Sequence, residues 1–311
     1  MKHLSNASRL EVDAASEGQR VDNFLLRVCK GVPRSHIYRI LRTGEVRVNS
    51  RRVDATYRLQ PGDRVRIPPV RLAERAHRKV PPAAQPPVVF EDAALLVVDK
   101  PAGAAVHGGS GLSYGVIEQL RAARPELKFL ELAHRLDRET SGLLIVAKKR
   151  SALTALHAAL REGEIRKRYL VLVKGAWRDE KRHVSLPLRK YVTRAGERRV
   201  SVDREGRASD TIFKRERSYR DYTLLSAELL TGRTHQIRVQ LAHLGFPIAG
   251  DDKYGDFKLN RVLAQQGLKR MFLHAAELEF KHPLSGFAVK LDSPLPSELA
   301  GFLCLLEEKP A

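Results

Sequence analysis

The chain has 311 residues, of which 43% are hydrophobic and 6% aromatic, and its formal net charge is +20. This length accommodates one sizeable core and a smaller module, so we expect two domains. The sequence contains no apolar stretch approaching the roughly 18 residues of a membrane span. The first residues, with Lys2, Arg9 and Glu11, do not resemble a signal peptide, which predicts a cytoplasmic protein without a membrane partner.

The excess of positive charge predicts a polyanionic partner. A membrane surface would also attract it, but the amphipathic helices of the sequence have only ordinary core-facing apolar residues, so nucleic acid is favoured. The two cysteines, Cys29 and Cys304, lie far apart and have no histidine at metal-ligand spacing. We therefore expect a reducing compartment and neither a disulfide nor a metal site.

The first domain is predicted at residues 18–70, after a weakly patterned tail at 1–17. Apolar residues recur at helical spacing from Val21, and a second helix follows with Gly44 placed to end it. Val46 and Val48 alternate with polar residues and begin a hairpin, whose return strand we expect to start at Val53.

This first domain is strongly basic. Residues 20–79 contain 16 Lys or Arg and 5 Asp or Glu, so their net charge of 16 − 5 = +11 makes up more than half of the total of +20. Arg34, Arg39 and Arg42 lie outside the apolar face of the second helix, which makes them candidates for contacts with an RNA backbone. The layout resembles the S4 RNA-binding domain, an α/β fold. A basic face that is merely solvated is the plainer alternative.

A proline-rich linker is predicted at residues 71–87 and a larger domain at 88–311. The larger domain begins with a strand at 95–98 and a glycine-rich stretch at 106–111. That stretch matches neither the Walker pattern nor the dinucleotide fingerprint, so no nucleotide cofactor is indicated.

A charged segment then leads into a buried strand. His134-Arg135-Leu136-Asp137 is followed by Thr140-Ser141-Gly142 and an apolar run, and such a junction can hold a side chain rigidly. Asp137 lies between two arginines, so its carboxylate should stay ionised and available as a nucleophile or base. The plainer alternative is a surface loop whose aspartate pairs with an arginine.

The later elements alternate without a regular pattern. Arg168 to Val173 is predicted as a central strand with Tyr169 near its start, and residues 184–229 contain further strands. A helix that begins in Thr-His-Gln-Ile-Arg offers unpaired backbone donors to an anion, and it contains Arg238. The mixture indicates an α+β domain with a mixed, largely antiparallel sheet.

The motif from His134 to Gly142 resembles the signature of the RluA-type pseudouridine synthases, and the order of segments from Val21 to about His282 resembles members acting on large-subunit ribosomal RNA. The resemblance implies isomerisation of uridine to pseudouridine in 23S ribosomal RNA by base flipping. It implies no cofactor, because the glycosidic bond is broken and remade without a redox change. We expect the protein to act as a monomer.

The resemblance also implies residue roles. Asp137, Tyr169 and Arg238 match the active-site positions of the family, in which the arginine pairs with the aspartate. Arg135 would fill the gap left by the flipped base, with a plain phosphate contact as its alternative. Arg233 and His235 are predicted to shape the cleft or to contact the RNA backbone. Asp137 could attack the sugar, attack the base or remove a sugar proton.

Other functions remain compatible with the sequence. A noncatalytic ribosome-assembly factor would share the basic domain, but it would not need Asp137, Tyr169 and Arg238. An RNA N-glycosidase would also use a carboxylate, together with a second acid or base that activates water. Family members that modify other ribosomal or transfer RNA uridines carry the same core motif.

Overall fold

We describe a computed structural model of the chain at residues 7–29, 31–70, 85–108, 114–193 and 196–307. The chain divides into two compact units, residues 1–81 and 82–311, and each is described by itself. The glycine-rich stretch continues beyond Gly108 outside the described residues, as does most of the predicted linker. None of the described helices is long and apolar enough to cross a membrane.

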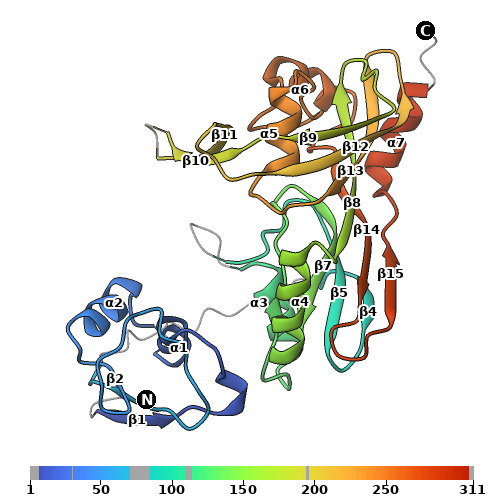
Figure 1. Ribbon diagram of the computed structural model, residues 1–311. Helices are drawn as coiled ribbons and strands as arrows, with labels where there is room; N and C mark the ends of the chain where they lie inside the picture. Colours follow the sequence, from blue (N-terminus) through green and yellow to red (C-terminus); the bar gives the residue numbers. More distant parts are fainter. Residues whose placement is uncertain (1–6, 30, 71–84, 109–113, 194–195, 308–311) are drawn as a thin grey trace. The chain divides into compact units, whose positions relative to one another are not determined.

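The described part of the first unit contains the α-helices α1 and α2 (Figure 1) and an antiparallel sheet with the order β1-β3-β2. Its core consists of apolar side chains from both helices and all three strands. Arg34, Arg39 and Arg42 are exposed on α2, as predicted. The elements are β1 (Ser8–Glu11), a 3-10 helix (Ala14–Ser16), α1 (Val21–Val28), α2 (Arg34–Arg42), β2 (Arg47–Val48) and β3 (Arg64–Ile67).

The prediction of a tail over residues 1–17 is wrong for the part of it that the structure describes. Residues Ser8–Glu11 form β1 and pair with β3, with Leu10 opposite Val65. Val12 is buried in the core of this unit. The strand is only four residues long and half of it is exposed, so its sequence pattern is too short to stand out.

The predicted hairpin forms its turn but not its return strand. Asn49 and Ser50 have φ of 49° and 66°, as a tight turn requires, and Val48 bridges to Arg51. Val53 lies outside the strands, and β2 pairs with β3 instead. The hydrogen-bonding partner of β2 therefore comes from a segment more distant in sequence than the turn indicated.

The second unit is built on one mixed sheet (Figure 1). Within the described residues its order is β4-β5-β7-β14-β8-β13-β12-β9, with β15 beside β14 and β6 beside β7. These pairs are antiparallel except β7 with β14, which confirms the predicted largely antiparallel sheet. The strands are β4 (Val88–Glu91), β5 (Leu95–Lys100), β6 (Glu131–Leu132), β7 (Ser141–Ala147), β8 (Arg166–Lys174), β9 (Lys181–Ser185), β12 (Asp210–Ser218), β13 (Tyr222–Leu229), β14 (Leu273–Lys281) and β15 (Ala288–Asp292).

Within the described residues, five helices and a separate hairpin complete this unit. The strand β8 has partners on both sides, β13 and β14, so the prediction that it is central is confirmed. Helix α6 lies in a segment for which the sequence analysis made no prediction. The remaining elements are α3 (Val116–Ala123), α4 (Arg150–Glu162), β10 (Leu188–Val192), β11 (Arg198–Val202), α5 (Gln236–His243), α6 (Phe257–Gln265) and α7 (Ser297–Glu307).

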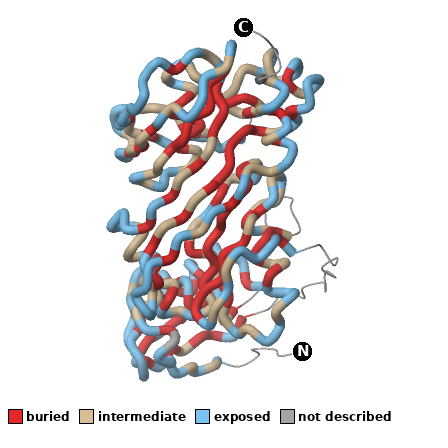
Figure 2. Tube along the Cα trace, turned by 90° about the vertical axis from the view of Figure 1, so that its right-hand side faces the viewer, coloured by how far each residue is buried: buried red, intermediate tan, exposed pale blue. Residues whose placement is uncertain are grey.

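Alternating side chains of the strands enter two separate cores. In β5, Leu96 and Val98 belong to one apolar cluster and Leu95 and Val97 to the other, because successive side chains of a strand point to opposite faces. The first cluster includes α3 and α5, and the second includes α4. Figure 2 shows buried segments running along the strands. The sheet is therefore a rigid base with apolar packing on both faces.

A glycine permits the one parallel pairing among these strands. Gly142 follows the charged segment and pairs with Ala275 of β14 at φ 109°. A Cβ atom at Gly142 would lie 2.2 Å from the carbonyl oxygen of Ala275, which no side chain can accept without a backbone shift.

We predict that Gly142→Ala lowers the free energy of unfolding by about 3 kcal/mol or more, because the new Cβ clashes with backbone in addition to the strain of a positive φ. Gly267→Ala is the matched control, since Gly267 has φ 100° but no atom lies within 4 Å of the place that a new Cβ would take, and it should cost about 1 to 2 kcal/mol. Urea denaturation measures both values. Equal losses would show that the close approach to Ala275 is unimportant.

Candidate active site

The segment that carries Asp137 is anchored at its beginning by His134. The ring Nε2 of His134 accepts a hydrogen bond from the backbone N–H of Ile145 at 3.1 Å. Enclosure by the protein lowers the pKa of His134, and the nearby charge of Lys167 lowers it further, so the ring stays neutral and able to accept. His134 therefore fixes the segment to β7.

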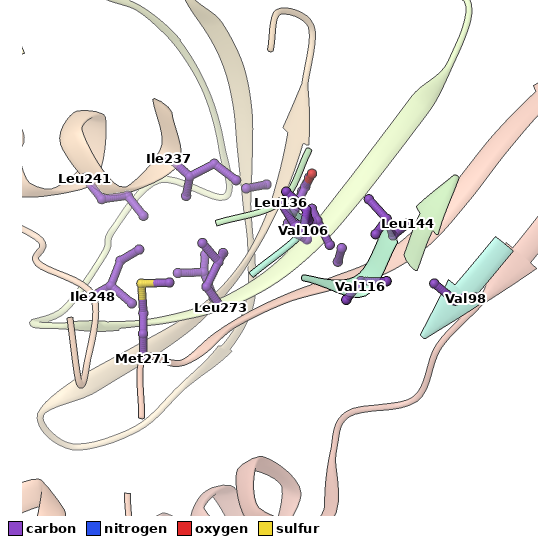
Figure 3. Packing of buried hydrophobic residues seen from close by; sticks show 14 of the residues in the cluster. Val98, Val106, Val116, Leu136, Leu144, Ile237, Leu241, Ile248, Met271 and Leu273 are labelled. Atoms are coloured by element: carbon purple, nitrogen blue, oxygen red, sulfur yellow. The ribbon is translucent and has the colours of Figure 1, made fainter. Parts of the chain in front are cut away.

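Core packing brings Asp137 and Arg238 together, although they lie 101 residues apart. Their chain neighbours Leu136 and Ile237 are both buried in the same apolar cluster, shown in Figure 3. Arg238 Nη1 donates to Asp137 Oδ2 at 3.0 Å. The predicted pairing of these two side chains is thus present in the structure.

Arg238 is shared with a second carboxylate, that of Asp251. Its Nε and Nη2 donate to the two oxygens of Asp251, both at 2.8 Å, and the two residues are only 5% and 1% exposed. Burial raises the pKa of Asp251, but the hydrogen bonds and charge of Arg238 outweigh that effect and lower it. The carboxylates of Asp251 and Asp137 likewise raise the pKa of Arg238 despite its burial. This ion pair keeps the guanidinium oriented toward Asp137.

Tyr169 is the third predicted residue of the site, and it lies on β8. Its side chain is buried and lines the same cavity as Asp137 and Arg238. Burial raises the pKa of the Tyr169 phenol, and the negative charge of Asp137 raises it further. The residue is therefore a neutral hydroxyl group close enough to Asp137 to be affected by its charge.

The cavity has a volume of about 920 Å³ and collects most of the residues predicted from the sequence. Asp137, whose side chain is 24% exposed, is accessible within it. The cavity is large enough for an extruded nucleotide, since ligand pockets span about 300–1,000 Å³. The predicted site residues on its lining are Arg135, Asp137, Tyr169, Arg233, His235 and Arg238.

Exposed arginines border this cavity. Arg135 and Arg233 also line an adjoining pocket of about 480 Å³, together with Arg189, Lys190 and Arg207. This concentration of cations suits an anionic backbone. By contrast, the three arginines of α2 belong to the first unit and are not part of this cavity.

Two functional candidates escaped prediction, Lys100 and Asp251. The Nζ of Lys100, at the end of β5, donates to the carbonyl oxygens of Pro101, Ala104 and Arg138 at 2.9, 2.8 and 3.0 Å. Burial lowers the pKa of Lys100 to about 7. The contact with Arg138 ties β5 to the residue beside Asp137. A lysine that continues an apolar strand was the only sequence signal.

A second buried network supports the segment after Asp137. Arg270 Nη2 donates to Ser141 Oγ at 2.7 Å, and this hydroxyl also contacts His274 Nδ1 at 2.9 Å. The charged segment is thus fixed at both ends. Among the described residues, no group of three or more His, Cys, Asp or Glu side chains could hold a metal ion.

Comparison with known proteins assigns families to both units. Residues 94–243 match the family model described as RNA pseudouridylate synthase, and residues 19–65 match the S4 domain.

Several curated bacterial relatives are similar over nearly the whole chain. Those of Escherichia coli K12, Salmonella typhi and Pasteurella multocida are 53%, 51% and 50% identical over 296, 318 and 306 residues. These matches cover 93%, 99% and 96% of this chain and 93%, 100% and 94% of the relatives. Each relative is named ribosomal large subunit pseudouridine synthase C.

Solved structures agree with the fold. The human RNA pseudouridylate synthase domain containing 4 superposes with a TM-score of 0.58 at 23% identity, over 72% of this chain and 94% of that one. The human RNA pseudouridylate synthase domain containing 1 superposes with a TM-score of 0.57 at 24% identity, over 74% of this chain and 99% of that one.

We predict that Asp251→Asn lowers the free energy of unfolding at pH 7 by about 3 to 5 kcal/mol, because it leaves the buried charge of Arg238 poorly compensated. The pKa of Asp251 is lower in the folded chain than its ordinary 3.8. Its stabilising contribution is therefore present above about pH 4 and is lost as the pH falls through the folded value.

Urea denaturation between pH 7 and pH 3 measures this effect. The difference in free energy of unfolding between the wild type and Asp251→Asn should become smaller as the pH is lowered. Asp252→Asn is the matched control, because the Asp252 side chain is 72% exposed and lies 3.7 Å from Arg238 Nη2. We expect less than about 1 kcal/mol from it. A similar loss from both variants would contradict the special position of Asp251.

Proposed function

Because this chain belongs to the RNA pseudouridylate synthase family, we propose that it converts uridines of large-subunit ribosomal RNA into pseudouridine. The chain is a pseudouridine synthase, an isomerase, by its near full-length similarity to curated members. The observation that supports the proposed chemistry best is the contact between Asp137 Oδ2 and Arg238 Nη1 at 3.0 Å in a cavity that Tyr169 also lines.

The target uridine must leave its stack before a side chain can reach its glycosidic bond. The cavity of about 920 Å³ has room for an extruded nucleotide. Arg135, two positions before Asp137 and exposed at the cavity border, is the residue that we propose to fill the gap in the RNA. Arg233 is also exposed at this border and would contact the RNA backbone.

Asp137 is proposed to act on the extruded nucleotide. Arg238 holds one carboxylate oxygen, which fixes the side chain. The other oxygen, Oδ1, is then the one that can approach the substrate. It could attack the anomeric carbon or the base, or remove a sugar proton, and the geometry is compatible with each route.

Tyr169 is proposed to take part after the new carbon–carbon bond has formed. The negative charge of Asp137 contributes to the raised pKa of the phenol. Any step that neutralises Asp137, by a covalent bond or by a proton, removes this contribution and lowers the pKa of Tyr169. The phenol then becomes a better participant in removing the proton from the base ring.

The first unit is also proposed to bind the RNA. It matches the S4 domain, and its exposed Arg34, Arg39 and Arg42 lie along one helix. Their phosphate contacts would add affinity without sequence information. We propose that the protein works in the cytoplasm as a monomer.

We predict that the protein releases tritium from ribosomal RNA labelled at uracil C5 without releasing free uracil, and that Asp137→Asn reduces the rate by at least about a thousandfold. An asparagine amide cannot act as a nucleophile or base, although it preserves the size of the side chain. RNA affinity should change little. Scintillation counting combined with nucleoside chromatography measures release and product.

Asp179→Asn serves as the control for this substitution, because Asp179 is an exposed carboxylate that pairs with Arg182 outside the cavity. Free uracil would indicate an N-glycosidase. Binding without any tritium release in the wild-type protein would indicate a noncatalytic RNA-binding factor.

We predict that replacing Arg34, Arg39 and Arg42 together by Gln weakens RNA binding and reduces its dependence on salt. If all three contact phosphate, the slope of log affinity against log salt should decrease in magnitude by about 2 to 3. The control replaces the exposed Lys258, Lys281 and Lys290, which removes the same charge from the second unit. Filter binding at several salt concentrations measures both. Identical slopes in the two variants would contradict the proposed role of α2.

A further inference from the structure

His235 faces the oxygen of Asp137 that Arg238 does not hold. The ring Nε2 of His235 lies 3.9 Å from Asp137 Oδ1, and the two side chains are 17% and 24% exposed. Both residues line the cavity. His235 therefore faces the oxygen of Asp137 that we propose to be reactive. The RNA backbone contact predicted for His235 from the sequence does not explain this position.

The backbone of His235 has an unusual conformation. Its φ is 55°, in the left-handed region, immediately before helix α5 begins at Gln236. Among the described non-glycine residues only Asn49, Ser50 and His235 have positive φ, and the first two form a tight turn. Such conformations cost free energy and persist where the surrounding structure enforces them, often at functional sites.

Tyr254 favours one of the two tautomers of the His235 ring. The Tyr254 hydroxyl oxygen accepts the backbone N–H of Val200 at 3.0 Å and lies 2.7 Å from His235 Nδ1. Burial raises the pKa of Tyr254 to about 12, so the phenol keeps its proton and can donate it to Nδ1. In the neutral ring the hydrogen then resides on Nε2, the nitrogen that faces Asp137.

The ring is neutral near pH 7 on balance. Burial lowers the pKa of His235, and the charges of Arg238 and Lys253 lower it further, against Asp137 and Asp251, which raise it. Tyr254 contacts the ring edge-on at a centroid distance of 5.4 Å. His235 therefore presents one N–H donor to the cavity rather than a full positive charge.

The separation of Nε2 and Oδ1 suits an intervening hydroxyl group. At 3.9 Å the two atoms are too far apart for a direct hydrogen bond. A hydroxyl oxygen can lie about 2.8 Å from both, accepting from Nε2–H and donating to Oδ1. A hydroxyl group fits this pair because it is at once an acceptor and a donor.

We propose that His235 Nε2 and Asp137 Oδ1 together bind the 2′-hydroxyl group of the target uridine. This inference rests on the proposed function and specifies its substrate contact. The 2′-hydroxyl is attached to the carbon beside the anomeric carbon, so binding it would place the reacting sugar atoms against Oδ1. It would also make the site selective for ribose over deoxyribose, since this group distinguishes RNA from DNA.

Two substitutions of His235 separate the donor from the rest of the side chain. Asparagine tolerates the left-handed backbone and can still accept from Tyr254, but it is too short to present a donor in place of Nε2. Glutamine is longer and can place an amide N–H near the position of Nε2. His243→Asn is the matched control, because His243 is an exposed histidine at the other end of α5.

The experiment uses the full chain and a synthetic RNA that spans a target uridine located by mapping pseudouridines in treated ribosomal RNA, made with either uridine or 2′-deoxyuridine at that position. Single-turnover rates and dissociation constants are measured for each protein with each RNA. We expect the ratio of rates between the two substrates to be about tenfold smaller in His235→Asn than in the wild type and in His243→Asn. His235→Gln should recover part of that ratio.

An unchanged ratio in a folded His235→Asn protein would overturn the inference, whatever the loss of absolute rate. Intrinsic effects of the missing hydroxyl on the chemistry cancel, because all proteins receive the same two substrates. Wild-type activity on the uridine RNA, with a ratio that no variant alters, would leave the proposed function intact and refute only the hydroxyl site. Absence of pseudouridine in the wild-type reaction would instead refute the proposed function.

Discussion

The site depends on one buried guanidinium group that two carboxylates share. Arg238 forms a two-point contact with Asp251 and a single contact with Asp137. Removing an arginine from water is costly, and Asp251 compensates for much of that cost, because it is buried and receives further backbone hydrogen bonds. Asp137 is therefore not the only carboxylate that balances the charge of Arg238. It can remain accessible in the cavity and still be oriented by a fixed cation.

Apolar packing and hydrogen bonds around the Asp137–Arg238 contact hold Asp137 in place. Leu136 and Ile237 pack into one core, so the same apolar cluster anchors the backbone on either side of the ion pair. Lys100 holds the carbonyl of Arg138 on the other side of Asp137, and Ser141 is held by Arg270. Such support matters because a displacement of about 1 Å in a reacting group can cost about a hundredfold in rate.

Much of this arrangement could be predicted from the sequence, and the failures have physical causes. Asp137 and Tyr169 were singled out because their motifs resemble those of a known family, whereas the local pattern alone indicated only a charged junction and an apolar strand. Asp251 was not, because a carboxylate in a loop of polar residues gives no sign that it is buried. Lys100 was missed although it follows an apolar strand, because a lysine at that position indicated only the end of the strand. Burial of a charged group depends on distant segments, which local patterns do not reveal.

The parallel pairing of β7 with β14 has a consequence for biosynthesis. It joins residues 133 positions apart, as the contact of Ser141 with His274 shows. Closing such a large loop carries a higher entropic cost than closing a short hairpin, so we expect this pairing to form late in folding. A chain still emerging from the ribosome lacks β14 until Leu273–Lys281 have been made. The nascent polypeptide therefore cannot assemble a complete cavity beside the very class of RNA on which its relatives are named to act.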